Sequence, residues 1–142
     1  MNINKFTQKS MEAVQNCEKI ASDYGNQEIE QEHLLYSLLT LDDSLIEKMD
    51  IDPQTFLNRV EELIEKRPKV QGGQPYVGQY LNKVLISAED EMKVFGDEYV
   101  SVEHIFLAMI KHPSSTIKNL FKEFGITRDT FLQALHTVRG NQ

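Results

Sequence analysis

The sequence has 142 residues, one cysteine and a formal net charge of −7, which fits one ordinary domain with a core of its own. The charge argues against a nucleic-acid surface, which needs clustered Lys and Arg, and a single cysteine excludes an intramolecular disulfide. No run approaches the ~18 apolar residues of a membrane span, and the start lacks the apolar stretch of a signal peptide, so we expect a cytoplasmic protein.

The acidic residues are unevenly distributed along the chain. Residues 1–71 hold 8 basic and 14 acidic residues, a net charge of −6, whereas residues 72–142 hold 7 and 8, a net charge of −1. The first half therefore favours positively charged or mixed partners, although an acidic surface often serves solubility alone.

The first predicted helix begins after Thr7, a good N-cap residue, and Phe6 before it can pack on Met11 as a hydrophobic staple. Gly25 ends the helix in the manner of a left-handed C′ residue. Spacings of three and four mark one apolar face, on which the cysteine is interpreted as a small buried hydrophobic residue. That face comprises Met11, Val14, Cys17, Ala21 and Tyr24.

Three further helices are predicted in the first half. A short second helix opens with Glu32-His33 and continues with apolar residues, and a third is expected over roughly residues 43–49. Asp52-Pro53 has the pattern of an N-cap followed by the first helical residue, which starts a fourth helix. No segment carries a strand pattern of any length.

Residues 67–77 are rich in Pro and Gly and are predicted to be a linker between two halves. The linker is too short to let the halves drift apart, and each half alone is near the lower limit for a self-sufficient core. We therefore expect one fused domain over residues 1–142. Tyr76, Val77 and Tyr80 at the linker exit are expected to leave apolar surface exposed, as a peptide groove requires.

After the linker, the same elements recur at a shift of 71 residues. Glu103-His104 repeats the first Glu-His pair, and Gly96 repeats the helix stop at Gly25. Gly78 is the expected cap of the long helix that precedes Gly96. The face that this helix is expected to bury comprises Leu81, Leu85, Ala88, Met92 and Phe95.

The repeat fixes the expected fold class. Towards the end of each copy the shift becomes 75, so four extra residues are expected in the second copy near residues 112–119. Each copy carries about four helices, too many for a single solenoid turn. The prediction is an all-α fold with two tandem, pseudo-equivalent four-helix repeats, about residues 1–66 and 78–142, packed into one eight-helix bundle.

The sequence lacks the common signatures of catalysis. It has no phosphate-binding loop, no His-Glu-x-x-His motif, no cysteine pair and no Gly-x-Ser-x-Gly elbow, so the chain is not expected to be an enzyme or to hold a cofactor or metal. A metal site would need residues from both copies, such as Glu32 and His104, to converge. In the simpler interpretation each His caps its helix while each Glu lies near the positive end of the helix dipole. A carboxylate there is also well placed to bind a guanidinium or a backbone N–H.

Three segments resemble the Clp N-terminal repeat domain, which stands at the front of ring-forming protein-unfolding ATPases. The resemblance covers nearly the whole chain and is strongest to the ClpB, or disaggregase, branch. The segments are QEIEQEHLL at residues 27–35, GDEYVSVEH at residues 96–104 and the closing VRGNQ at residues 138–142.

This resemblance implies that the chain is one part of a larger protein. The full protein would carry two ATPase modules, which would use ATP and magnesium, and a coiled-coil insertion, and would form a hexamer. It would extract polypeptides from aggregates together with the DnaK chaperone system. The domain itself would capture unfolded or aggregated chains, would be monomeric in isolation, and would bind neither nucleic acid nor membrane.

The resemblance also implies site residues. Thr7, Asp97 and Glu103 match positions linked to substrate handling in the ClpB branch. In the related ClpC branch, the Glu of each Glu-His pair helps to hold the guanidinium of phosphoarginine, which maps onto Glu32 and Glu103. No Arg or Lys lies near either Glu in the sequence to bind the phosphate. An apolar groove between the repeats would add three further contact residues, Tyr80, Leu81 and Leu85.

Three functions therefore compete at this point. The first is a substrate-capture module, and the second is a reader of a modified residue or a dock for an adaptor protein. The third is a mobile lid or spacer that binds nothing. A metal or hydrolase role ranks last.

Overall fold

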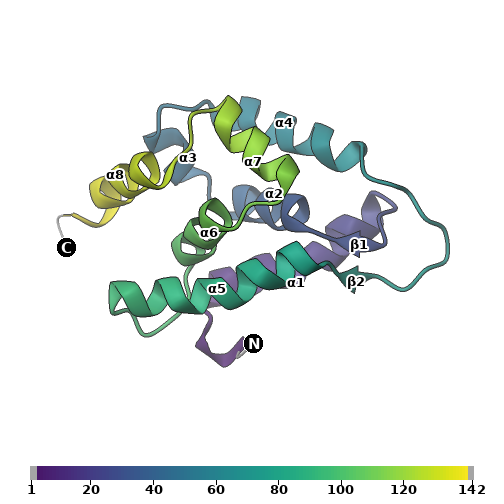
Figure 1. Ribbon diagram of the computed structural model, residues 1–142, viewed down its shortest axis with the longest axis horizontal. Helices are drawn as coiled ribbons and strands as arrows, with labels where there is room; N and C mark the ends of the chain where they lie inside the picture. Colours follow the sequence, from purple (N-terminus) through teal and green to yellow (C-terminus); the bar gives the residue numbers. More distant parts are fainter. Residues whose placement is uncertain (1–2, 141–142) are drawn as a thin grey trace.

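The computed structural model describes residues 3–140, so Met1 and Asn2 at the start and Asn141 and Gln142 of the closing segment lie outside the described residues. Within that range the regular structure is almost entirely helical (Figure 1), which confirms the predicted all-α fold of two four-helix repeats. No helix among residues 3–140 is both long and apolar enough to span a membrane. After a short 3-10 helix, η1 (Ile3–Lys5), the α-helices are α1 (Gln8–Asp23), α2 (Gln31–Leu41), α3 (Ser44–Lys48), α4 (Pro53–Glu65), α5 (Gln79–Phe95), α6 (Val102–Lys111), α7 (Ser115–Glu123) and α8 (Arg128–Arg139).

The helix ends follow the local sequence signals. The Thr7 side chain accepts a hydrogen bond from the backbone N–H of Ser10 at 3.2 Å, as an N-cap does. Asp52 caps α4 in the same way, through the N–H of Thr55 at 2.9 Å. After α1 and α5 the chain turns through Gly25 and Gly96, whose φ angles of 73° and 71° lie in the left-handed region that favours glycine.

The buried face of α1 is offset from the predicted face. Met11 and Val14 are only partly buried, and their neighbours Ser10 and Ala13 take the inward positions. The Ser10 hydroxyl donates to the Val100 carbonyl at 2.6 Å, so a polar residue is satisfied inside the core. The prediction is confirmed for Cys17 and Ala21, which are buried, but it placed the first two turns of the face one residue too far along. The residues that α1 buries are Ser10, Ala13, Cys17 and Ala21.

Short parallel strand pairs join the two repeats, which corrects the expectation of no strand. β1 (Glu28–Ile29) pairs with β2 (Tyr76–Val77) in parallel, with Ile29 opposite Val77. A single bridge pairs Phe6 with Val100, and both of its residues lie 71 positions from those of the Ile29–Val77 pair. The segment before each repeat's first helix therefore pairs with the other repeat. Two-residue strands are too short to show an alternating pattern.

The helices of the two repeats also interlock. α7 has nine residues where α3 has five, so the four extra residues of the second copy lengthen this helix. α3 packs on α8, and α4 meets the end of α7 through an edge-to-face contact of Phe56 with Phe124, at 4.9 Å between ring centroids. The buried apolar side chains form one cluster that includes residues from both repeats.

Gln31 is a buried polar link between the repeats. Its side-chain N–H groups donate to the carbonyls of Tyr80 at 3.1 Å and His112 at 2.8 Å, and its carbonyl oxygen accepts from the N–H of Ser114 at 2.9 Å. Gln31 starts α2, whereas all three partners belong to the second repeat. The start of α2 is thereby fixed beside the starts of α5 and α7.

Candidate functional site

The first Glu-His pair lies at the start of α2, where its histidine is a neutral cap. Nδ1 of His33 accepts the backbone N–H of Glu30 at 2.9 Å, and Nε2 lies 3.0 Å from Oδ1 of Asn26. Because Nδ1 accepts from a backbone donor, the ring proton lies on Nε2 and is donated to Asn26. Burial, reinforced by the nearby charge of Arg67, lowers the pKa of His33 to about 4.

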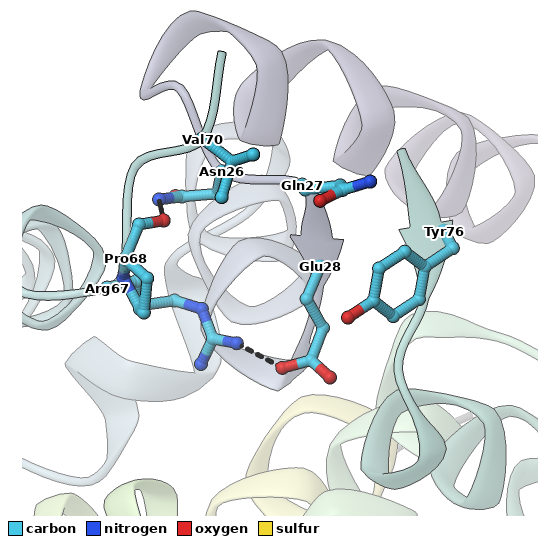
Figure 2. A pocket seen from close by; sticks show the side chains of 7 residues that line it. All are labelled: Asn26, Gln27, Glu28, Arg67, Pro68, Val70 and Tyr76. Carbon is cyan, nitrogen blue, oxygen red and sulfur yellow. Dashed lines mark hydrogen bonds and ion pairs between the residues drawn. The ribbon is translucent and has the colours of Figure 1, made fainter. Parts of the chain in front are cut away.

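Glu32 forms a buried ion pair with a residue of the predicted linker. The guanidinium of Arg67 donates to Glu32 at 2.6 Å and to Glu28 at 2.6 Å, and Figure 2 shows its bond to Glu28. Glu32 is only 1% exposed, so its carboxylate depends on this partner. Within residues 3–140, Oε1 of Glu32 and Nε of Arg67 are buried with no hydrogen-bond partner. We name Asn26, Glu28, Glu32, His33 and Arg67 cluster one.

Arg67 lines two cavities. One, of about 140 Å³, lies between the start of β1 and the linker, with the Tyr76 hydroxyl directed towards Glu28 (Figure 2). The other, of about 170 Å³, has a wall of carboxylates from the first repeat and a wall from the second. It includes Tyr80, which is 47% exposed. Its lining residues are Glu28, Glu30, Glu32, Arg67, Tyr80, Ser114, Ser115 and Thr116.

Glu30 caps two helices at once. Its carboxylate accepts the N–H of Gln31 at 3.1 Å, at the start of α2, and the N–H of Tyr80 at 3.2 Å, at the start of α5. Gly78, the N-cap of α5, has no side chain, and a Cβ there would collide with the Glu30 carboxylate. Burial raises the pKa of Glu30, against the lowering effect of these two hydrogen bonds. Glu is not among the residues preferred at an N-cap, yet this side chain serves both repeats.

The second Glu-His pair has the same cap but an ionic partner. Nδ1 of His104 accepts the N–H of Ser101 at 2.9 Å, and Nε2 lies 2.8 Å from Asp97. Asp97 occupies the position of Asn26 and also accepts from Arg139 at 3.0 Å. Burial opposes its ionisation, but the hydrogen bonds from Arg139 and His104 prevail and lower the pKa of Asp97.

Glu103 lies at the rim of this second group. Its carboxylate is 3.8 Å from Nε of Arg139, whose guanidinium also covers the Phe95 ring at 5.5 Å from its centroid. A shallow cavity of about 290 Å³ opens beside these groups and is mostly apolar in its lining residues. Those residues are Phe95, Leu132, Leu135, His136 and Arg139. We name Asp97, Glu103, His104 and Arg139 cluster two.

The predicted site residues lie in three different places in the structure. Thr7 lies beside cluster two, since its N–H donates to the carbonyl of Val100, in the loop between Asp97 and Glu103, at 2.9 Å. Glu32 and Tyr80 line the cavity at cluster one. The remaining two, Leu81 and Leu85, are 2% and 4% exposed and pack in the core, where neither side chain is free for direct contact.

The arginines are the functional groups that sequence reasoning missed. Arg67 lies 35 residues after Glu32 and Arg139 lies 36 residues after Glu103, so no local spacing links them. One repeated sequence signal did point to these clusters. A polar residue lies seven positions before each histidine, Asn26 before His33 and Asp97 before His104. Among residues 3–140, no group of three or more His, Cys, Asp or Glu could hold a metal ion.

Comparison with known proteins identifies the family to which this repeat architecture belongs. The Clp repeat (R) N-terminal domain matches residues 5–124. The chain belongs to this family. Chaperone protein ClpB of Nitratidesulfovibrio vulgaris is 39% identical over 152 residues, covering 100% of this chain and 18% of that protein. Chaperone protein ClpB of Bacillus anthracis is 38% identical over 151 residues, covering 100% of this chain and 17% of that protein. The chain thus spans less than a fifth of these relatives.

Solved Clp N-domains share the fold. The Hsp104 N-terminal domain of Candida albicans has a TM-score of 0.84 at 23% identity, covering 97% of this chain and 93% of that one. The N-domain of ClpV, solved in complex with a VipB peptide, has a TM-score of 0.73 at 19% identity, covering 94% of this chain and 86% of that one. At these identities the likeness concerns the fold alone.

Proposed function

We propose that this Clp N-domain captures substrates for a ClpB-type ATP-dependent chaperone that disaggregates and refolds stress-damaged proteins. It would bind unfolded or aggregated polypeptide in the cytoplasm and pass it to ATPase modules elsewhere in the full protein, which would bind ATP and magnesium and form a hexamer. The DnaK system would act through that full protein. Whole-chain identity of 37–39% to four ClpB chaperones supports this assignment.

The observation that carries the proposal is the mixed polar and apolar surface around cluster two. Arg139 lines the shallow apolar cavity and is paired with Asp97 and Glu103, and Tyr99, in the same loop as Asp97, is 53% exposed. Extended unfolded chains offer apolar side chains together with free backbone N–H groups. Such a surface can accept both, the side chains in the cavity and the N–H groups at the carboxylates.

The cluster-one side would contribute less direct contact. Tyr76 and Tyr80 are exposed there, but the Glu32 carboxylate is already held by Arg67. Leu81 and Leu85 would support the surface from beneath rather than touch the substrate. Weak binding suits this role, because six tethered copies on a ring raise the effective concentration of sites.

An NMR titration with a permanently unfolded polypeptide tests the proposal. Amide shifts are expected to gather at Thr7, Phe95 and residues 97–103, and Glu103→Lys is expected to weaken them. Glu18→Lys, which reverses the same charge at an exposed position of α1, serves as the matched control. Shifts that survive Glu103→Lys unchanged would place capture elsewhere, and no shifts at high substrate concentration would favour the lid.

The phosphoarginine reader remains the second candidate, because the glutamate of each Glu-His pair faces a guanidinium. Here those guanidiniums belong to Arg67 and Arg139, at 2.6 Å from Glu32 and 3.8 Å from Glu103. An incoming phosphoarginine would have to displace one of them. Free phosphoarginine that raises the melting temperature of the domain would support the reader, and no change would favour capture.

A further inference from the structure

We propose that a groove between α6 and α7 binds an acidic peptide segment anchored by one large apolar side chain. The groove has a volume of about 460 Å³, within the ~300–1,000 Å³ typical of ligand pockets. It shares no residue with either Glu-His cluster, and its function does not depend on the capture proposal. Its lining residues are Ile110, Lys111, Pro113, Lys118, Phe121, Lys122, Ile126 and Thr127.

The floor of the groove is apolar. Phe121 and Ile126 face it from within the core and are 4% and 5% exposed, and Ile110 and Pro113 are partly buried beside them. A large apolar side chain entering the groove would cover this surface and be removed from water. At roughly 25 cal/mol for each Å² buried, such a contact supplies the anchor of a peptide complex.

The rim of the groove is basic. Lys111, Lys118 and Lys122 are exposed and line it, and none of them forms an ion pair within residues 3–140. Three unpaired cations around one opening stand out on a chain of net charge −7. They create a local positive field that attracts carboxylates on both sides of an apolar anchor.

The other repeat shows that the fold does not require these lysines. At the shift of 75 residues, the positions of Lys118 and Lys122 are held by Asp43 and Glu47 in and beside α3. The same structural place thus carries opposite charge in the two repeats. The basic rim is a property of the second repeat alone, and it selects an acidic partner that the first repeat would repel.

The test measures fluorescence anisotropy of a labelled peptide with one Leu between two Asp-Glu pairs, titrated with the domain. We expect saturable binding that Lys118→Glu/Lys122→Glu weakens at least about tenfold, equivalent to about 1.4 kcal/mol. Lys48→Glu/Lys93→Glu changes the net charge equally at exposed positions outside the groove and is expected to leave binding within about twofold of wild type.

Two further measurements keep the result decisive. A peptide with Lys in place of each acidic residue, and one with Gly in place of Leu, are both expected to bind at least about tenfold more weakly. Equal binding by either peptide, or by the Lys118→Glu/Lys122→Glu variant, would overturn the proposal. Sedimentation of the domain alone tests whether a second copy of this chain occupies the groove. Self-association that the Lys118→Glu/Lys122→Glu variant abolishes would overturn the peptide proposal in favour of that second copy.

Discussion

The two Glu-His pairs have the same spacing and the same capping geometry, yet their surroundings differ. In cluster one the glutamate is buried against Arg67 and the histidine meets the neutral amide of Asn26. In cluster two the glutamate is at the rim, and the histidine meets the carboxylate of Asp97. One motif is therefore used once as an internal link and once as an open polar surface.

This difference shows which features of a site a repeated sequence determines and which it does not. The histidine caps follow from bonds within a few residues, and both copies form them identically, at 2.9 Å. The glutamates depend on arginines that arrive from the ends of the repeats, after α4 and at the end of α8. The local part is the same in the two repeats, and the distant partners differ.

The largest expected effect comes from removing the arginines. Arg67→Met would leave the Glu32 carboxylate buried without its partner and is expected to cost about 3 kcal/mol of unfolding free energy. Arg139→Met removes a pair that is about one third exposed and is expected to cost less than about 1 kcal/mol. Urea denaturation of both variants measures the contrast.

The double variant Arg67→Met/Glu32→Gln serves as the control. If the buried charge causes the loss, neutralising Glu32 restores part of the stability. Equal losses for Arg67→Met and Arg139→Met would mean that the two clusters do not differ in their contribution to stability.

The second prediction concerns pH and His33. The pKa of His33 is about 4 in the folded protein, below its usual value of 6.5, so folding favours the neutral imidazole over the protonated one. Its contribution is complete above pH 6.5 and is lost as the pH falls from 6.5 towards 4, by up to about 3 kcal/mol. Urea denaturation across this range, compared with His33→Gln, measures the difference.

That comparison isolates His33 from two other groups with shifted pKa values. Burial raises the pKa of Glu30, which acts in the opposite direction and stabilises the fold as the pH falls. The pKa of Asp97 is lowered below its usual 3.8, so its contribution is lost only at still lower pH. A stability curve of His33→Gln parallel to wild type between pH 6.5 and 4 would refute the assignment.

Local signals in the sequence were enough for the helices and their ends. The caps at Thr7 and Asp52 and the stops at Gly25 and Gly96 each depend on residues within one turn. The same holds for the histidine caps. The helix stops and the Glu-His pairs were also easier to predict because the repeat presents each of them twice.

Contacts between distant residues could not be predicted in the same way. Arg67 appeared to belong to a linker, and nothing near it in sequence points to Glu32. Leu81 and Leu85 were predicted to help form the site from the same apolar pattern that places them in the core. Periodicity indicates which face is apolar, but it does not say whether another helix or a ligand covers that face.

The third prediction exchanges the histidine partners. Asn26→Asp would lose the hydrogen bond that the Asn26 amide donates to the Pro68 carbonyl at 3.1 Å and would bury a charge beside Glu28. We expect a loss of about 2 kcal/mol. Asp97→Asn keeps a partner for His104 at a partly exposed position and is expected to cost less than about 1 kcal/mol. Thermal unfolding of the two variants measures both, and a larger loss for Asp97→Asn would reverse the roles of the clusters.

The smallest expected contrast is between the N-caps that stand at equivalent places, Thr7 and Gly78. Thr7→Ala removes the acceptor for the Ser10 N–H and is expected to cost about 1 kcal/mol. Gly78→Ala supplies no cap and brings a Cβ against the Glu30 carboxylate, which caps α5 from the other repeat. We expect it to cost slightly more, about 1–2 kcal/mol, because a buried acceptor is displaced as well.

Combining Gly78→Ala with Glu30→Ala separates the two causes. If displacement of Glu30 accounts for the loss, Gly78→Ala is nearly neutral in the Glu30→Ala background, and urea denaturation of the four proteins closes the cycle. Additive losses would show that a Cβ at position 78 is unfavourable independently of the Glu30 carboxylate. Because Gly78 has an extended backbone with a φ of −72°, which alanine also adopts, we expect displacement of the carboxylate to be the cause and the losses not to add.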